Sequence, residues 1–93
     1  MDKNIVDLRQ TIDKWNSIVL RKTGEQRDAL ICQYIKNLGL KFNKIVLDPL
    51  FSIEVIGEEV KYTDPRGVVQ DIKEHNAPGI WSLLVTYKDD LIL

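Results

Sequence analysis

The hydrophobic pattern of this 93-residue chain changes near residue 42, and this change constrains the fold more than any other feature. Before that point, apolar residues recur every three or four positions, a spacing typical of amphipathic helices. After it, they mostly alternate or form short runs rich in Val, Ile and Tyr, which is typical of strands. The sequence therefore predicts one α+β domain over residues 1–93, with helices packed on one face of a sheet.

The composition is that of an ordinary globular domain, with 44% hydrophobic and 29% charged residues and a net charge of -1. High apolar content and low net charge argue against disorder. The small acidic excess gives no support to nucleic-acid binding from overall charge. The apolar runs are far shorter than the roughly 20 residues that cross a bilayer, so we expect no membrane association. Cys32 is the single cysteine and cannot form an internal disulfide, which indicates a cytoplasmic protein.

Two amphipathic helices are expected in the first half of the chain. The first spans residues 4–22, and Asp2 or Asn4 can cap its start. Its apolar stripe consists of Ile5, Leu8, Ile12, Trp15 and Val19. The second spans residues 25–38 and ends at Gly39. The short joint between the two favours an antiparallel helical hairpin.

A β-hairpin is expected where residues 50–56 and 59–63 flank Gly57-Glu58. Glycine in the first position of a two-residue loop suits a type II′ turn. The loop length then fixes the register and places three pairs opposite each other: Val55 with Val60, Ile53 with Tyr62, and Glu54 with Lys61. Apolar pairs on one side and an opposite-charge pair on the other agree with a single register.

Three further segments complete the expected fold. Residues 44–47 form a first strand or an extended connector, and Pro49 fits a strand end. Residues 65–75 follow an Asp-Pro pair and are expected to form a short helix. Residues 80–87 are apolar or β-favouring on both sides, which suggests an interior strand. The fold class is thus a helical hairpin on a mainly antiparallel sheet of three to four strands, with a short helix before the last strand.

Residues that carry chemistry are sparse. His75 is the only histidine, and Asp71 would share its helix face if residues 65–75 were helical, so one interpretation is a base that the carboxylate orients. We favour an exposed histidine near a helix end instead. One Cys and one His without ligand spacing do not supply a zinc site. Glycine-rich phosphate motifs are missing from the sequence. We expect no catalytic residues, no metal and no cofactor.

Arg66 is the candidate for anion binding. It lies in the cluster Asp64-Pro65-Arg66-Gly67, where a guanidinium near a helix start would meet free N–H groups. The same four residues suit an ordinary turn and cap, which is the interpretation that we favour.

A basic group is the candidate for nucleic-acid binding. Glu25 and Asp28 are interleaved with it and weaken its local field. The group consists of Arg21, Lys22, Arg27, Lys41 and Lys44.

Protein contact is the third possibility. Sheet edges in a small domain are open to a partner strand. The apolar end Leu91-Ile92-Leu93 either packs back on the domain or extends a shared sheet. Together with Glu54 and Lys61 on the polar side of the hairpin, these residues are the candidate protein-binding site.

The preferred hypothesis is a small intracellular protein-binding or regulatory module that acts through a protein surface. Inhibitors, immunity or antitoxin-like factors and complex subunits fit this description, with a protein partner or self-association. The alternative is a nucleic-acid-binding protein, and the third hypothesis is a small enzyme, which is ranked last because so short a chain has little room for a deep pocket.

Overall fold

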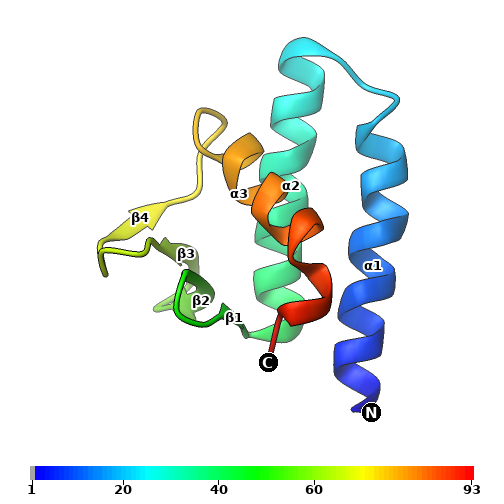
Figure 1. Ribbon diagram of the computed structural model, residues 1–93. Coiled ribbons are helices and arrows are strands. Elements are labelled where there is room, and N and C mark those ends of the chain that lie inside the picture. Colours follow the sequence, from blue (N-terminus) through cyan, green and yellow to red (C-terminus); the bar gives the residue numbers. More distant parts are fainter. Residues whose placement is uncertain (1) are drawn as a thin grey trace.

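In the computed structural model, which describes residues 2–93, three helices stand beside a four-stranded sheet (Figure 1). The helices are α1 (Lys3–Val19), α2 (Gly24–Phe42) and α3 (Ala77–Thr86), followed by a 3₁₀ turn (Lys88–Asp90). The strands are β1 (Lys44–Leu47), β2 (Phe51–Ile56), β3 (Glu59–Thr63) and β4 (Val69–Asp71). The predicted α+β class is confirmed.

The helical hairpin has the expected arrangement with shifted ends. The side chain of Asp2 accepts the N–H of Asn4 at 2.8 Å and caps α1, as expected for an N-cap aspartate. The helix ends at Val19, three residues before the predicted end, and Lys22 N–H bonds back to the Val19 carbonyl at 3.0 Å. Such an i→i+3 bond tightens the final turn and satisfies a carbonyl that would otherwise be free.

Gly39 does not end α2, contrary to the prediction. The helix continues to Phe42, and Asn43, at φ 66°, caps it by donating its N–H to the Gly39 carbonyl at 2.8 Å. Gly39 is buried because Val60 of β3 packs against it: an added Cβ would lie 2.4 Å from Val60 Cγ1. The glycine therefore allows close approach of helix and sheet rather than a chain reversal.

The sheet is a meander with strand order β1-β2-β3-β4, and every pair is antiparallel. The predicted hairpin register is confirmed, with Glu54 opposite Lys61 among its pairs. In the turn, Gly57 has φ 68° while Glu58 has no positive φ, as a type II′ turn requires. The segment 44–47 is a true strand, and the turn containing Pro49 follows it.

The predicted helix over residues 65–75 is wrong; this segment is a turn followed by β4. The Asp64 carboxylate does act as a cap, but it accepts the N–H groups of Arg66 at 2.9 Å and Val68 at 3.0 Å within the turn. Gly67 takes φ 84°, which reverses the chain toward β3. The Asp-Pro signal therefore belongs to a turn.

The predicted strand over residues 80–87 is also wrong, since residues 80–86 lie within α3 and Tyr87 caps its end. Asn76 precedes the helix and Pro78 occupies its first turn, where a missing N–H costs nothing. A segment with apolar residues at both odd and even positions also fits a helix that is buried on more than one side. Ile80, Trp81 and Leu84 are all buried.

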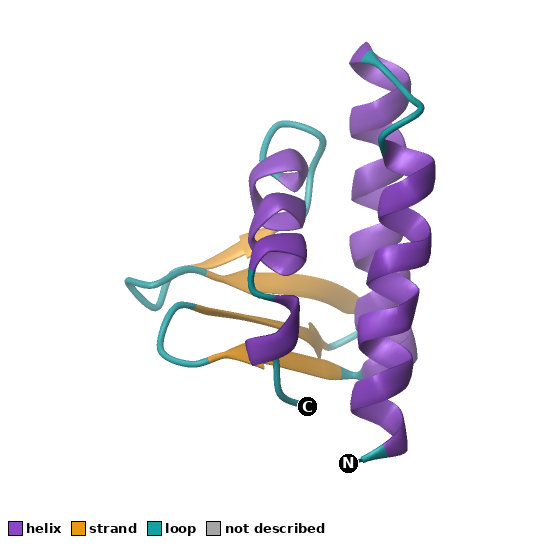
Figure 2. Ribbon diagram, turned by 45° about the vertical axis from the view of Figure 1, so that its right-hand side comes forward, coloured by secondary structure: helices purple, strands orange, loops and turns teal. Residues whose placement is uncertain are grey.

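The core lies between the sheet and the helices. Figure 2 shows the sheet on one side, with α3 running alongside the pair α1 and α2. Helix α2 contacts β1, β2 and β3, while α3 contacts α1 and α2. The largest side chains with less than 2% exposure are Leu8, Ile12, Ile35, Leu38, Ile45, Ile53, Leu84 and Leu91. None of the helices in residues 2–93 has the length and apolar character to span a bilayer.

The apolar C-terminus packs back on the domain through Leu91, which is fully buried. The next residue, Ile92, pairs with Val46 of β1: each residue donates its N–H to the other's carbonyl at 2.8 Å. This pairing covers the outer edge of β1. Leu93 remains 44% exposed.

Candidate protein-interaction surface

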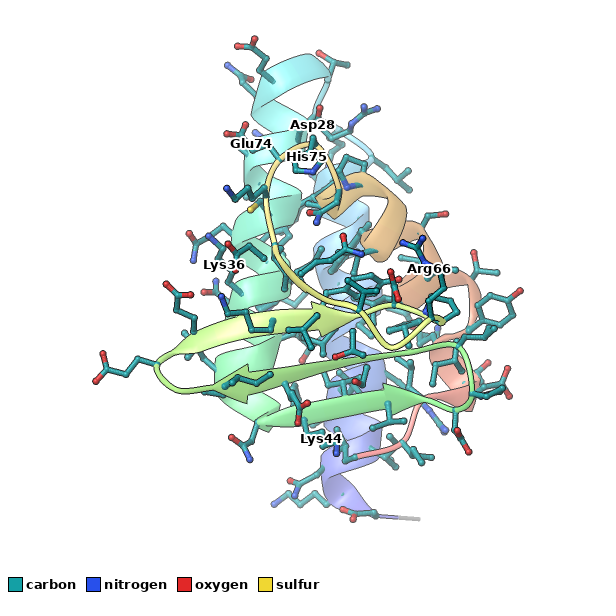
Figure 3. All side chains as sticks on the ribbon, turned by 90° about the vertical axis from the view of Figure 1, so that its left-hand side faces the viewer. Asp28, Lys36, Lys44, Arg66, Glu74 and His75 are labelled. Atoms are coloured by element: carbon teal, nitrogen blue, oxygen red, sulfur yellow. The ribbon has the colours of Figure 1, made fainter. Side chains whose placement is uncertain are left out.

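One face of the sheet is turned away from all three helices, and we call it the outer sheet face (Figure 3). Side chains alternate between the two faces of a strand, so the buried Ile53 and Tyr62 point inward and their chain neighbours point outward. The outer sheet face is formed by Lys44, Val46, Ser52, Glu54, Ile56, Glu59, Lys61, Thr63, Val69, Asp71 and Ile92.

A row of alternating charges crosses this face from one edge strand to the other. Lys44 lies opposite Glu54, Glu54 opposite Lys61, and Lys61 opposite Asp71. We call these four residues the charge row. Neighbouring strands are about 4.8 Å apart, so the signs run positive, negative, positive, negative over roughly 14 Å. The Nζ of Lys44 lies 3.8 Å from a Glu54 carboxylate oxygen, and Lys61 forms an ion pair with Asp71.

Lys61 is the most strongly held member of the charge row. Its ammonium donates to Asp71 and, at 2.7 Å, to Glu59, and these two carboxylates raise the pKa of Lys61 above its ordinary 10.5. In return, the hydrogen bond and charge of Lys61 lower the pKa of Asp71 below 3.8. Both groups are therefore charged at neutral pH. The side chain of Lys61 is 21% exposed, whereas that of Asp71 is 54% exposed.

A second row, mostly apolar or β-branched, runs beside the charge row. Residues that lie directly opposite each other in a sheet share a face. The register therefore aligns Ile92, Val46, Ser52, Thr63 and Val69, which we call the apolar row. Its two ends are the most exposed members, with Ile92 at 55% and Val69 at 52%. Ile56, 43% exposed, adds a further apolar side chain on the other side of the charge row.

The two edges of the sheet differ. The edge at β1 is covered at Val46 by the backbone of Ile92. At the other edge, the Asp64 N–H bonds to the Val68 carbonyl at 3.0 Å and Gln70 pairs with Tyr62, so the backbone of Val69 points outward. Within residues 2–93 no strand lies beyond β4. The outer sheet face is thus continuous with an uncovered edge.

The predicted protein-binding residues divide into two groups. Glu54 and Lys61 lie at the centre of the outer sheet face, and Ile92 lies at the end of its apolar row. Leu91 contributes to the core instead of the surface. Lys44, proposed for nucleic acid, belongs to the charge row beside Glu54.

The predicted basic group does not form one patch. Arg21, Lys22 and Arg27 lie around the α1–α2 joint, at the top of Figure 1, and Lys41 and Lys44 lie around the other end of α2. At 1.5 Å per residue, the helix separates positions 27 and 41 by about 21 Å. Three of the five also have carboxylate partners: Arg27 with Asp28, Lys41 with Asp7, and Lys44 with Glu54.

Arg66 lies in the turn before β4, and its side chain is 79% exposed. Its guanidinium donates to the buried Asp64 carboxylate at 3.1 Å, so its charge is already paired. The Val68 N–H, helped by Arg66, lowers the pKa of Asp64 below 3.8. The turn-and-cap interpretation accounts for these contacts without a ligand.

His75 and Asp71 do not lie on a common helix. His75 is exposed in the loop above the sheet, labelled in Figure 3, whereas Asp71 is paired with Lys61. Residues 2–93 contain no cluster of three or more His, Cys, Asp or Glu side chains that could hold a metal ion. The hollow between α2 and the end of β4, about 360 Å³, has a mixed-charge rim with Lys36, Glu58 and Lys73. No acid–base or nucleophile pair follows from these placements.

The sequence reasoning found only half of the charge row. Glu54 and Lys61 followed from the hairpin register, but Lys44 and Asp71 required the flanking strands. The short apolar run over residues 45–47 and the Asp48-Pro49 turn after it were the available signals for the strand that carries Lys44. No comparable signal marked β4, which has only three residues.

Comparison of the chain with protein-family models, curated proteins and solved structures finds no match.

Proposed function

We propose that this chain is a small intracellular protein-binding module that acts through the outer sheet face. An inhibitor, an immunity or antitoxin-like regulatory factor, or a subunit of a complex would each use such a surface. The observation that carries the proposal is the ordered pattern of this face, in which a charge row and an apolar row run in parallel across the whole sheet.

The chemistry of the face suits a protein partner. Its exposed apolar side chains, Ile56, Val69 and Ile92, are all β-branched and lose little rotamer freedom on binding. They stand on a paired sheet, which is a rigid support. The neighbouring alternating charges would select a partner by electrostatic complementarity and reject like charges.

The other two hypotheses have less support. A nucleic-acid-binding protein needs clustered cations that track phosphates, whereas the basic residues here lie at both ends of α2 and are partly paired. An enzyme needs convergent catalytic groups in a pocket. His75 is exposed instead, and Asp71, the carboxylate considered as its partner, is paired with Lys61. A cytoplasmic location remains part of the proposal because the only cysteine, Cys32, is free and buried.

Site-specific photo-crosslinking tests the proposal. A photoreactive amino acid replaces Thr63 on the outer sheet face, and in a matched control it replaces Ser17, which is exposed on α1. In native cells we expect the first variant to crosslink one protein in stoichiometric amount and the control to crosslink none. The proposal fails if both positions give the same products or if neither gives any.

Binding by the purified partner then separates direct contact from proximity. Thr63→Arg places a bulky charge in the apolar row and should weaken binding at least tenfold, which corresponds to about 1.4 kcal/mol. Lys14→Glu, a charge change of two units at an exposed position of α1, should leave the affinity unchanged. Equal affinities for Thr63→Arg and the unaltered protein would exclude the outer sheet face as the contact.

A further inference from the structure

We propose that the outer sheet face binds the same face of a second copy of this chain. This inference rests on the proposed function and names its partner. It follows from the order of signs in the charge row, Lys44, Glu54, Lys61, Asp71, which becomes its own complement when it is reversed.

A two-fold axis parallel to the strands produces that reversal. The first strand of one copy then lies over the fourth strand of the other, and the second strand over the third. Lys44 of each copy faces Asp71 of the other, and Glu54 faces Lys61. All four contacts join opposite charges, as an isologous interface requires of a self-complementary patch, and they add to the ion pairs that Lys44 and Lys61 already form within each sheet.

The other two-fold arrangement that brings the two charge rows together is excluded by charge. An axis that runs across the strands places each strand over its own equivalent, so Lys44 would face Lys44 and Glu54 would face Glu54. Like charges held opposite each other across an interface oppose association. The charge row therefore selects one of two otherwise similar ways to stack the sheets.

The apolar row is compatible with the same axis. Reversal places Val46 over Val69 of the second copy and Ser52 over Thr63. These side chains are small or β-branched, so two sheets can approach to the usual spacing of about 10 Å. The natural twist of each sheet gives an angle of about 30° between the two sets of strands.

The size of the face predicts a weak dimer. Four strands at about 4.8 Å spacing and five residues at about 3.3 Å give roughly 300 Å² per copy. The total of about 600 Å² is below the roughly 1,200 Å² of stable complexes. Association should therefore depend on protein concentration and weaken with salt, because the paired charges lie at a surface where the screening length is about 10 Å at 0.1 M.

Two charge-reversal variants test the arrangement by mixing. Glu54→Lys alone places a cation opposite Lys61 of an identical copy, and Lys61→Glu alone places an anion opposite Glu54, so neither variant should associate with itself. When the two variants are mixed, every contact in the charge row again joins opposite signs. Sedimentation equilibrium should show dimers for the unaltered protein, monomers for each variant, and one-to-one heterodimers for the mixture.

A second pair of variants protects the test against loss of folding. Lys44→Glu and Asp71→Lys change the ends of the charge row, where side chains are 56% and 54% exposed. Each variant places like charges opposite each other in an identical pair and should be monomeric. In the mixture all contacts join opposite charges, so the two variants should associate. Circular dichroism and thermal unfolding of each variant verify that monomers are folded. An effect on folding within one chain cannot produce heterodimers that neither variant forms alone.

The inference is overturned if the unaltered protein stays monomeric up to millimolar concentration, or if the mixtures of folded variants do not associate. It is also overturned if the single variants dimerise as well as the unaltered protein. These outcomes are distinguishable from failure of the proposed function. If only the dimer inference fails, Thr63→Arg still weakens the binding of a different, purified partner. If neither the dimer nor this effect of Thr63→Arg is observed, the outer sheet face is not a binding surface.

Discussion

Ile92 and Val46 exchange two backbone hydrogen bonds of 2.8 Å, so the end of the chain covers the edge of the sheet at β1. An uncovered edge strand is a template for pairing with other chains. The neighbouring Leu91 is fully buried and anchors this arrangement from the core side. Leu91 thus stabilises the core, while Ile92 covers the edge of β1 with its backbone and contributes its side chain to the outer sheet face.

Truncation of the anchor should be costly. Leu91→Ala removes a fully buried side chain, and such changes typically destabilise a protein by about 2–5 kcal/mol. Leu93→Ala, at a position that is 44% exposed, is the matched control and should change stability by less than about 0.5 kcal/mol. Urea unfolding curves measure both free energies of unfolding. Equal effects of the two substitutions would show that Leu91 does not anchor the C-terminus.

A larger residue at position 39 should force α2 away from the sheet. The Cβ of Gly39→Ala would lie 2.4 Å from Cγ1 of Val60 and 2.8 Å from Cγ2. Overpacking of this kind costs about 1–3 kcal/mol. Val60→Ala removes both methyl groups and should partly rescue the Gly39→Ala variant in a double-mutant cycle of unfolding free energies. Additive effects would contradict the contact.

Asn16 should stabilise the packing of α3 on α1. Its Oδ1 accepts a hydrogen bond from Nε1 of Trp81 at 3.0 Å, and Trp81 is only 3% exposed. Asn16→Ala leaves this donor without its partner and should cost about 1–3 kcal/mol. The comparison variant Asn37→Ala changes an amide on the exposed side of α2, which bonds only to Gln33 among the contacts of residues 2–93. Thermal unfolding should separate the two.

Acid should destabilise the turn before β4 through Asp64. Bonds from Val68 and Arg66 hold the pKa of Asp64 below its ordinary 3.8. Stability from this depressed pKa is present above about 3.8 and is lost as the pH falls through the folded-state value. Asp64→Asn keeps an oxygen acceptor for the turn but cannot titrate. Its unfolding free energy should therefore fall less steeply than that of the unaltered protein between about pH 5 and about pH 2.

The acid prediction has a matched comparison in Asp48. Asp48→Asn makes the same substitution at an exposed position in the turn between β1 and β2. Parallel slopes for Asp64→Asn and the unaltered protein would contradict the role given to Asp64.

The sequence was sufficient where two independent signals agreed. The Gly57-Glu58 turn fixed the hairpin register, and the apolar and charged pairs on its two faces supported the same alignment. The stripe of α1 was equally clear because its period was sustained over several turns. These features depend on neighbours that are close in the chain, which is why sequence pattern alone could identify them.

The last third of the chain was misassigned because its signals were ambiguous in isolation. Residues 80–87 are apolar on both sides, and only packing against α1 and α2 decides between a buried strand and a buried helix. Asp64-Pro65 begins either a helix or a turn, and Gly67 at positive φ decides for the turn. Gly39 was interpreted as a helix end because its contact, Val60, lies on a distant strand.

Concentration-dependent NMR shifts test the central claim most directly, that the outer sheet face is where this protein meets other proteins. Dilution from millimolar to micromolar protein should shift the amide signals of Glu54, Lys61 and Thr63 along one common curve. Signals of the exposed side of α1, such as that of Ser17, should stay fixed. Shifts confined to α1 would contradict the account. So would signals of the sheet that move neither with protein concentration nor on addition of the crosslinked partner.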